Sequence, residues 1–483
     1  MDTELFQLRG YVSPNDAGIM GDSDSASIQN AVDAALACGI GKVVIPKYNA
    51  RTHAFGWEIA KTILLDANLT VVLDDCYMRM ADDVYENFFR TNNLFGENSP
   101  DTSRELEHIE ILGQGNAVLD GGKANDLTEE TRFRDGRPHV AVNTPILFFN
   151  VRYFKVSNLS VINQRYWGMR FEFCKCGRIA DIFFCALVDR YNQDGINLRN
   201  GCHDIVIENI RAQTGDDTIA LSGIDSKRAD RWNLVDESQD NDIHDVVIRG
   251  VSGAAAGHPL VALRNHGGVK MYNILIEDIH DTAPIRRAFV KRYPRANPRE
   301  EDNPTPAEPR CFVDGPRYGL IRVGDKAYFS SSPSVMGDIW GIRIRRISAR
   351  WSQRAVVLGC EVRDIRIEDV SAAGLCRFAV STSPVGADGG PDLKAEDIDI
   401  DGVTMRAETQ EETAVLYTAD MVPDGYIRSM RIRNVNAENL THFAHLGRET
   451  GLELENIRIT GLKAEFTKVE NGCGDQVRIR IKE

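Results

Sequence analysis

The sequence predicts an all-β chain that folds as a right-handed parallel β-helix, a solenoid of stacked coils, with a capping helix at its N-terminal end. Two observations lead to this prediction. A short phrase recurs along the chain, built of an aliphatic residue, two mostly polar residues and a second aliphatic residue. Apolar and polar residues around it alternate at period two, which marks strands with one inward face, and helical spacing is nearly absent. A unit of this kind cannot bury its apolar face alone, so successive units must stack.

The spacing of the phrase sets the length of one coil. Leu159 to Ile182 is 23 residues, as is Ile347 to Val370, and the longer steps are interpreted as the same unit with inserted loops. Asn and Gly recur between the strands, as turns require. The occurrences are VSNL at 156–159, IADI at 179–182, IENI at 207–210, IRGV at 248–251, IEDI at 276–279, IRRI at 344–347, IEDV at 367–370, IDGV at 400–403, IRNV at 432–435 and ITGL at 459–462.

Two other repetitive β folds fit less well. A propeller of the WD40 type needs about 40–45 residues per blade and a Trp-Asp signature, which the chain lacks. A sandwich does not repeat one phrase so regularly. A solenoid of parallel strands therefore remains the predicted fold.

A solenoid needs a closed end, and the N-terminal region supplies a candidate cap. Residues 26–38 predict an amphipathic helix with Ile28, Val32 and Ala35 on one face. Ser25 is the expected N-cap and Gly39 the expected C-terminal stop. A helix over the first coil would shield its open core and strand edge. At the other end, residues 477–482 (VRIRIK) predict an outer strand.

These features define the predicted domain organisation. Residues 1–105 are expected to form the N-terminal cap and first strands, continuous with the helix, and residues 106–483 the parallel β-helix catalytic domain. Loops are inserted near 225–243 and 284–317. The segment 284–310 is rich in proline and arginine, and it is interpreted as an inert surface loop, a lid or an interface arm.

Composition excludes several classes of partner. The formal net charge is −14 and no long basic stripe occurs, so neither nucleic acid nor an anionic membrane is an expected partner. The N-terminus lacks the basic and apolar regions of a secretory signal, which predicts a cytoplasmic protein. The expected partner is a carbohydrate substrate, and homo-oligomerisation stays open.

The cysteines do not indicate a metal or redox centre. There are ten, and they are scattered along the chain. Cys174 and Cys176 form C-x-C rather than the C-x-x-C of a zinc knuckle or a thioredoxin-like site. They are predicted to be buried free thiols, and no cofactor and no metal are expected.

The chemistry is predicted to lie in two acidic stretches, NQDGIN at 192–197 and GDDTIAL at 215–221. Asp194 precedes Asp216 by 22 residues, close to one minimal coil. Equivalent positions on adjacent coils are about 4.8 Å apart, so Asp194 is expected beside Asp216 or Asp217 on the outside of the solenoid. Carboxylates this close cannot all ionise easily, and one pKa should rise. An acid beside a base is what glycoside hydrolysis requires.

Each acidic stretch has a simpler explanation when taken alone. Asp next to Gly is common in turns, and a single DG or DD pair carries little information. Two such stretches one coil apart favour a functional site over a pair of ordinary turns. A carboxylate cluster can also bind calcium, as it does in polysaccharide lyases built on similar solenoids.

With these motifs the chain resembles glycoside hydrolase family 28, the polygalacturonase family of the pectin-lyase-like β-helix superfamily. That family carries N-T-D, G-D-D, G-H-G and R-I-K in this order. The counterparts here are Asn192-Gln193-Asp194, Gly215-Asp216-Asp217, Gly257-His258-Pro259 and GLIRVGDK at 319–326. The second motif matches in full, the first has Gln for Thr and the third has Pro for Gly. In the fourth, Arg322 is the expected arginine and Lys326 a weaker lysine.

The resemblance implies an inverting glycosidase. Asp216 would be the general acid, and Asp194 and Asp217 would hold and deprotonate the attacking water. His258 would support protonation of the acid. Carboxylates about 6.5–9.5 Å apart would suit inversion, because a water must fit between them. The expected substrate-binding residues are Asn192, Arg264, His266, Lys270, Arg322 and Lys326.

Three functions follow from the sequence. The first is a cytoplasmic, exo-acting glycosidase for imported oligosaccharides, uronic-acid-containing or pectin-derived by resemblance, with the two inserted loops closing one end of the cleft. The second is a calcium-assisted lyase, or another sugar-transforming enzyme on the same scaffold. The third is a carbohydrate-binding or adhesive solenoid without catalysis. Fold alone does not decide among them.

Overall fold

The structure is a computed structural model. It describes residues 3–95, 99–100, 103–127, 140–188, 192–223, 239–255, 257–265, 268–283, 289–290, 310–311, 319–324, 334–359, 361–382, 394–419, 425–447, 449–470 and 474–482. The chain divides into two compact units, and each is described by itself. The first comprises Met1–Gly215, Arg228–Asp240 and Phe289–Pro309, and the second comprises Asp216–Lys227, Asn241–Ala288 and Arg310–Glu483. The predicted division at residue 105 stays a prediction.

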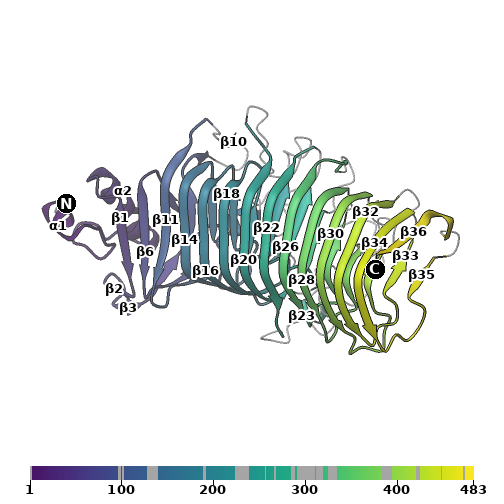
Figure 1. The fold of residues 1–483 in the computed structure, drawn as a ribbon. Helices are drawn as coiled ribbons and strands as arrows, with labels where there is room; N and C mark the ends of the chain where they lie inside the picture. Colours follow the sequence, from purple (N-terminus) through teal and green to yellow (C-terminus); the bar gives the residue numbers. More distant parts are fainter. Residues whose placement is uncertain are drawn as a thin grey trace, which may run out of the picture. The chain divides into compact units, whose positions relative to one another are not determined.

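The first unit consists of two helices and stacked parallel strands (Figure 1, purple to teal). The helices are α1 (Thr3–Arg9) and α2 (Asp24–Ala37), and a 3₁₀ turn spans Val140–Asn143. The longer parallel strands are β1 (Lys42–Pro46), β4 (Trp57–Ile59), β6 (Leu69–Asp74), β7 (Tyr77–Met80), β11 (Leu106–Gln114), β12 (Val118–Asp120), β14 (Val151–Ile162), β16 (Lys175–Cys185) and β18 (His203–Thr214). A second set of shorter parallel strands is β5 (Ile63–Leu65), β8 (Phe89–Thr91), β13 (Ile146–Phe149), β15 (Met169–Glu172) and β17 (Ile196–Leu198). Two antiparallel pairs complete it, β2 (Tyr48–Asn49) with β3 (Ala54–Phe55) and β9 (Leu94–Phe95) with β10 (Ser99–Pro100).

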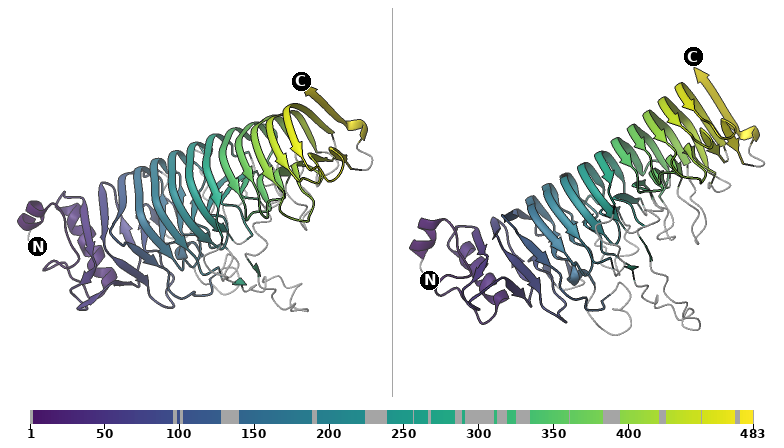
Figure 2. Two further views of the ribbon diagram at one scale, coloured as in Figure 1. Left: turned by 60° about the horizontal axis from the view of Figure 1, so that its bottom comes forward. Right: turned by 90° about the horizontal axis from the view of Figure 1, so that it is seen from below.

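The second unit repeats the same coil (Figure 2, green to yellow). Its long strands are β20 (Ile243–Ala255), β22 (Met271–Asp281), β26 (Ile339–Ala349), β28 (Val362–Ala372), β30 (Lys394–Arg406), β32 (Tyr426–Glu438), β34 (Glu449–Thr460) and β36 (Val477–Lys482). Its short strands are β19 (Ile219–Gly223), β21 (Val261–Asn265), β25 (Ile321–Val323), β27 (Arg354–Leu358), β29 (Phe378–Thr382), β31 (Ala414–Tyr417), β33 (Ala444–Leu446) and β35 (Thr467–Val469). The predicted right-handed parallel β-helix, all-β with an N-terminal helix, is confirmed as the fold class.

The recurring phrase lies within the long strands, and its third residue bends the backbone. In VSNL this is Asn158, with φ 58°, and in IDGV it is Gly402, with φ 80°. The third residue of every other predicted occurrence also has a positive φ. Asn, Asp and Gly adopt this left-handed conformation most readily, which explains their recurrence. The bend also turns both aliphatic residues of the phrase inward, as with Val156 and Leu159.

One predicted occurrence is wrong. The strand register pairs Ile432 with Leu454 and Val435 with Ile457, so the last coil carries its phrase as LENI at 454–457 rather than ITGL at 459–462. Asn456, third in that phrase, has a φ of 51°. The ITGL sequence has a similar pattern, but it straddles the end of β34 at Thr460. Register is set by which side chains reach the core, and Leu454 is fully buried.

The core of each unit is a set of aliphatic rows that run from coil to coil. In the second unit one row passes through β20, β22, β26, β28, β30, β32 and β34 at Ile248, Ile276, Ile344, Ile367, Ile400, Ile432 and Leu454. All seven side chains are fully buried. Full burial of one such side chain contributes about 1.5–3 kcal/mol, so the stacking of like residues holds the coils together. The outer strand predicted at 477–482 is β36, which pairs in parallel with β34.

The N-terminal helix forms where the sequence predicts it, but its cap is a different serine. The N-cap of α2 is Ser23, whose hydroxyl accepts the Ala26 N–H, and not Ser25. Ser25 instead accepts the backbone N–H groups of Ala60 and Lys61. It cannot cap the helix because it lies inside it. The helix packs on β1, β4 and β5 and so covers the first coil, as expected.

Several other predictions can be placed only in part. The insertions near 225–243 and 284–317 lie outside the described residues, except for 239–243, 289–290 and 310–311. The cysteines that the structure describes in full are free, as predicted, but only some are buried: Cys76, Cys174, Cys202 and Cys376 are, whereas Cys38, Cys176 and Cys185 are half-buried. In the described parts of the chain, no helix is long and apolar enough to cross a membrane.

Candidate active site

The acidic motif GDD lies at the start of a short strand of the second unit. Asp216 and Asp217 come just before β19, and His258 comes just before β21, the next short strand. The two strands pair in parallel, and the Thr218 N–H donates to the Pro259 carbonyl over 3.2 Å. Pro259 therefore contributes its acceptor to the coil, although it has no N–H to donate. Adjacent strands thus bring the second and third motifs together, as the sequence predicts.

The two aspartates have different partners. Asp216 Oδ1 lies 2.8 Å from His258 Nδ1 and also accepts the Asp217 N–H. Asp217 Oδ2 lies 2.7 Å from a guanidinium nitrogen of Arg264, while Asp217 Oδ1 is 3.9 Å from His258 Nδ1. Both carboxylates are buried, whereas the His258 and Arg264 side chains are each 16% exposed. Arg264 is a residue of strand β21 paired with an acid, and not part of a solvated turn.

These partners shift the pKa values of Asp216 and Asp217 in opposite directions. Burial raises the pKa of Asp216, but His258, with Arg264 and the Asp217 amide, outweighs burial and holds that pKa below its ordinary value. Burial raises the pKa of Asp217 to about 6, against the attraction of Arg264 and with the charge of Asp216 adding to the rise. The predicted split of the pKa values within the cluster is therefore present, with Asp217 as the raised member.

The cluster is compact enough to invite a cation. Donor atoms of Asp216, Asp217 and His258 all lie within 4.8 Å of one another. The Arg264 guanidinium, however, already places a positive charge on Asp217. A divalent cation at the same carboxylate would face that charge, so the residues do not fit a metal site well. The nearest oxygens of Asp216 and Asp217 are thus closer than the roughly 6.5–9.5 Å expected of an inverting pair, so these two carboxylates alone do not show that spacing.

Arg322 lies on the same face of the short strands as Ala262. It is the middle residue of β25, where it pairs with Ala262 of β21 and with Val357 of β27. Its positive charge lowers the pKa of Asp217, which places it within electrostatic reach of the acidic cluster. Residue 324, two positions further on and just after β25, is Gly, so no lysine follows Arg322 at the R-I-K spacing.

Asp194 lies in the first unit, just before β17. Its side chain is buried, and its Oδ2 accepts a hydrogen bond from Asn197 Nδ2 at 3.2 Å. Its carbonyl accepts the Gly168 N–H of the neighbouring coil. Asn192, two residues earlier, is partly exposed and has a φ of 59°. Whether these residues act with Asp216 and Asp217 stays a prediction.

Sequence reasoning missed a charged cluster on the short strands of the first unit. Arg170 and Glu172 of β15 form a buried ion pair of 2.6 Å. The guanidiniums of Arg170 and Arg199 lie 5.5 and 5.4 Å from the Trp167 ring. Trp167 also stacks on Tyr166 within an apolar cluster. Arg170 and Arg199 are 29 residues apart, about the length of one coil. This spacing was the signal in the sequence that could have predicted the cluster.

One predicted substrate-binding residue, Lys270, is not brought to the cluster, and two others cannot be placed. Lys270 is exposed just before the long strand β22, and its backbone groups bond to Asp242 and Ile243. It faces a different sheet because the chain turns a corner after β21. His266 and Lys326 lie outside the described residues.

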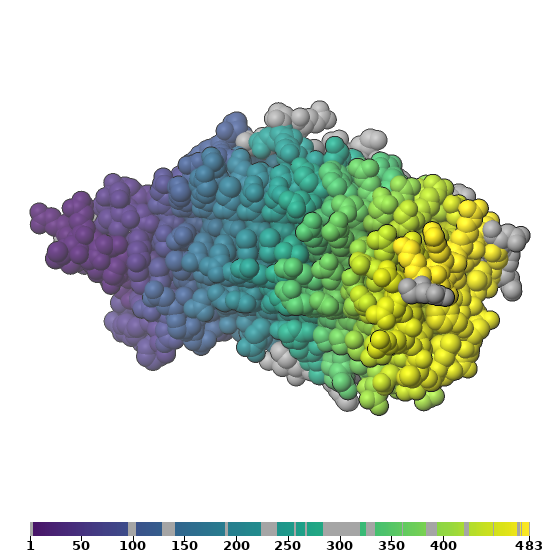
Figure 3. Space-filling view, in the orientation of Figure 1, coloured from purple at the N-terminus to yellow at the C-terminus, as the bar shows by residue number. Residues whose placement is uncertain are grey.

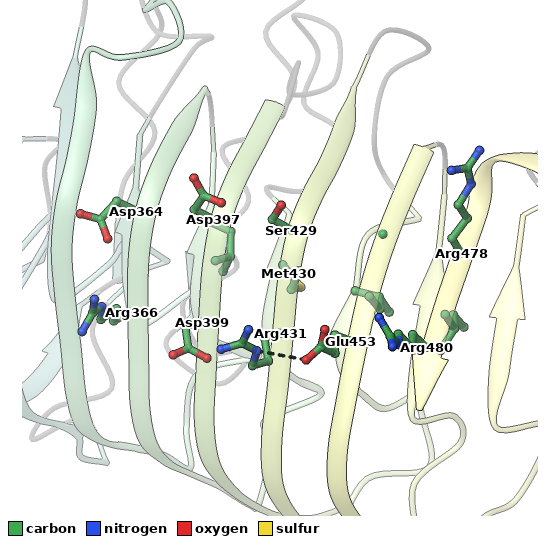
Figure 4. A pocket seen from close by; sticks show the side chains of 14 residues that line it. Asp364, Arg366, Asp397, Asp399, Ser429, Met430, Arg431, Glu453, Arg478 and Arg480 are labelled. Atoms are coloured by element: carbon green, nitrogen blue, oxygen red, sulfur yellow. Dashed lines mark ion pairs between the residues drawn. The ribbon is translucent and has the colours of Figure 1, made fainter. Parts of the chain in front are cut away.

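The second unit has another charged region, which lies on its long strands. Strands β28, β30, β32, β34 and β36 carry a row of alternating charge in register, Arg366, Asp399, Arg431, Glu453 and Arg480 (Figure 4). They line an open cleft of about 660 Å³ on the outer surface of the long strands. In Figure 3 the atoms of these strands, green to yellow, form part of the exposed surface. We call this row the charge ladder.

The sequence matches one family model in part. Residues 89–228 match the model of Glycosyl hydrolases family 28. This range contains the NQD and GDD motifs and ends before His258 and Arg322. No curated protein sequence matches the chain significantly. The family match supports a glycosidase.

Solved structures share the fold at low sequence identity. A polygalacturonase from Erwinia carotovora ssp. carotovora has a TM-score of 0.50 and 13% identity, and the match covers 87% of this chain and 94% of that one. The tailspike protein of E. coli bacteriophage HK620, in complex with a pentasaccharide, has a TM-score of 0.59 and 12% identity, covering 98% and 81%. PfbA, a surface adhesin of Streptococcus pneumoniae, has a TM-score of 0.50 and 10% identity, covering 95% and 93%.

These neighbours include a hydrolase and an adhesin, so the shared architecture by itself does not select an activity. The proposal of an activity therefore rests on the paired acidic residues and on the family match. The predicted resemblance is confirmed: residues 89–228 are similar to glycosyl hydrolases family 28, on a chain with a parallel β-helix fold.

Proposed function

We propose that this protein is a glycoside hydrolase that cleaves oligosaccharides containing uronic acids or derived from pectin. One observation carries the proposal: two adjacent buried carboxylates whose pKa values shift in opposite directions, one beside His258 and the other beside Arg264. Glycoside hydrolysis needs one group that delivers a proton to the leaving oxygen and one that accepts a proton from water. The match of residues 89–228 to the glycosidase family supports the same reaction.

Asp216 is the proposed general acid. The resemblance carries this role, because the pKa of Asp216 is held below its ordinary value and does not by itself favour a protonated carboxyl. His258 Nδ1 lies 2.8 Å from Asp216 Oδ1, so His258 is the proposed positioning residue, and a proton on its ring can pass to Asp216 and then to the glycosidic oxygen.

Asp217 is the proposed base. A general base works best when its pKa is close to the working pH, and burial brings the pKa of Asp217 to about 6. Arg264 orients this carboxylate. Asp194 enters the proposal through the sequence, as a second acid one coil before the GDD motif. Inversion of configuration is proposed on the resemblance alone, and nuclear magnetic resonance of the first-formed product tests it.

A substrate screen tests the proposed activity. Uronic-acid and neutral oligosaccharides would be incubated with the protein, and the products identified by mass and by reducing-end analysis. We expect hydrolysis of the acidic oligosaccharides and a loss of about 10²–10⁴-fold in rate for Asp216→Asn. Binding without turnover, at equal strength in Asp216→Asn, would favour an adhesive solenoid instead.

The same screen separates hydrolysis from elimination. A lyase product is unsaturated and absorbs in the ultraviolet, and a calcium-assisted lyase loses activity in chelator. We expect neither behaviour, because Arg264 occupies the carboxylate that a cation would need. Ultraviolet-absorbing product that disappears with chelator would replace the hydrolase proposal with a lyase.

Two further parts of the proposal concern where along the oligosaccharide the protein cleaves and where in the cell it acts. We propose exo action, with the insertions near 225–243 and 284–317 closing one end of the cleft. Deleting either insertion should then shift the products toward internal cleavage, and unchanged products would refute the closed end. Action inside the cell on imported oligosaccharides is proposed from the sequence, and fractionation of the source cells tests it.

A further inference from the structure

Four long strands of the second unit each repeat one sign of charge on their outer face. Positions two apart on a strand point to the same face of a sheet, so two rows of side chains cross these strands in register. From β30 to β36, the first row is Asp399, Arg431, Glu453 and Arg480, and the second is Asp401, Arg433, Glu455 and Lys482. The two rows therefore form four stripes, negative on β30, positive on β32, negative on β34 and positive on β36. We call this surface the striped face.

The striped face is open to solvent. Figure 4 shows the first row on four neighbouring strands, along the open cleft of about 660 Å³. The side chains at its two edges are well exposed, with Asp399 at 34% and Lys482 at 44%. Glu455 is partly exposed and Arg480 fully so. Both signs of charge are thus within reach of another molecule.

Ion pairs within one copy join neighbouring stripes. Arg431 lies 3.4 Å from Glu453, and a guanidinium nitrogen of Arg433 lies 3.1 Å from carboxylates of both Asp399 and Asp401. These contacts run sideways across the sheet, so they leave the order of the stripes unchanged. Exposed pairs of this kind contribute little to the stability of a chain. A regular order of charges can instead determine which surfaces associate, because complementary potentials favour a partner and like charges reject it.

We propose that the striped face binds the striped face of a second copy of this chain, about a two-fold axis that runs parallel to the strands between β32 and β34. Such an axis reverses the order of the strands. β32 then lies over β34 of the partner subunit, and β30 lies over β36. Each positive stripe meets a negative one in both rows, and the same surface serves both copies, as a closed dimer requires.

The order of the charges selects this arrangement over its neighbours. An axis across the strands would place each strand over itself, so that every stripe would meet its own sign. An axis one strand nearer the N-terminus would place β28 over β34 and leave β36 without a facing strand. Glu368 of β28 would then meet Glu455, because both belong to the second row. Like charges in contact oppose association, so the axis between β32 and β34 is preferred.

Charge reversal tests the proposed dimer. Sedimentation velocity of the full chain over a range of concentrations gives the Kd of self-association, which we expect to be measurable at low ionic strength and to rise with added salt. In Arg431→Glu two acidic pairs would meet across the axis, and in Glu453→Arg two basic pairs would meet. Each variant alone should raise Kd by roughly tenfold or more.

Mixing the two variants provides the decisive measurement. In an equimolar mixture of Arg431→Glu and Glu453→Arg, opposite charges face each other again at both positions. The mixture should therefore form a dimer with a Kd near that of the unmodified chain. Recovery on mixing also shows that both variants are folded. Asp399→Arg and Arg480→Glu repeat the test on the outer stripes, should either of the first variants fail to fold.

Arg366→Glu is the matched control. Arg366 belongs to the same row, but β28 lies outside the four facing strands, so its reversal should leave Kd unchanged. A rise in Kd for Arg366→Glu would refute the proposed axis. A chain that stays monomeric at low salt, a dimer that tolerates the single reversals, or a mixture that does not associate would each overturn the proposal. None of these results bears on the proposed hydrolase, since the striped face lies on the long strands.

Discussion

The acidic cluster and the charge ladder are both rich in charge, yet only one of them is suited to chemistry. In the ladder, positive and negative side chains alternate and stay exposed: Arg431 is 48% and Glu453 24% exposed, with 3.4 Å between them. In the cluster, Asp216 and Asp217 are adjacent, alike in sign and buried. Water screens the first arrangement and cannot screen the second. Burial of like charges therefore identifies the site more reliably than the number of charges.

The largest expected difference between the two regions is in catalysis. Asp217→Asn should lower kcat by about 10²–10⁴-fold, because the proposed base can no longer accept a proton from water. Asp399→Asn in the charge ladder removes the same negative charge from a partly exposed position and should change kcat little. Steady-state kinetics on the best oligosaccharide measures both. Comparable losses in the two variants would mean that the cluster is not the catalytic site.

The pH dependence should reflect the cluster alone. The pKa of Asp217 is raised to about 6, so the base is ionised above that pH and protonated below it. We therefore expect kcat/KM to fall as the pH drops through about 6. The Asp399→Asn variant should show the same limb. A limb near the ordinary pKa of an aspartate would contradict the assignment of Asp217 as base.

Removing the cation beside Asp217 should move that limb. Arg264 holds Asp217 at 2.7 Å and favours its charged form, so Arg264→Gln should raise the pKa of Asp217 further. The acid limb is expected to shift upward by about one pH unit or more. A pH profile of kcat/KM measures the shift, and recovery of the rate at higher pH separates it from misfolding. A downward shift would refute the role of Arg264.

The smallest effect is expected in the charge ladder itself. Arg431→Ala breaks an exposed pair and should lower the free energy of unfolding by less than about 1 kcal/mol. Added salt should shrink this difference further, since exposed charges are screened. Denaturant unfolding at two salt concentrations measures it. A loss of several kcal/mol that persists in salt would mean that the ladder holds the coils together.

The recurring phrase shows how much of the fold the sequence determined. Apolar residues that return once per coil must stack, so strands, parallel coils and the capping helix all follow from the pattern. Its third residue follows too, because Asn158 and Gly402 are among the few residue types that tolerate a positive φ. The sequence did not determine which residues carry the phrase in the last coil, because LENI and ITGL show similar patterns. Only the burial of Leu454 and the strand register decide for LENI.

For the candidate site, the sequence by itself determined the acidic motifs, because Asp216, Asp217 and His258 lie at fixed places on successive coils. The partners were decided by tertiary structure. Arg264 reaches Asp217, and Arg322 comes within electrostatic reach of it, only because strands distant in the sequence align in one register. A pKa depends on burial and on charges a few ångströms away, and neither is written in the order of residues. The sequence could therefore name the acids, while the fold decided which carboxyl has the raised pKa and which the lowered one.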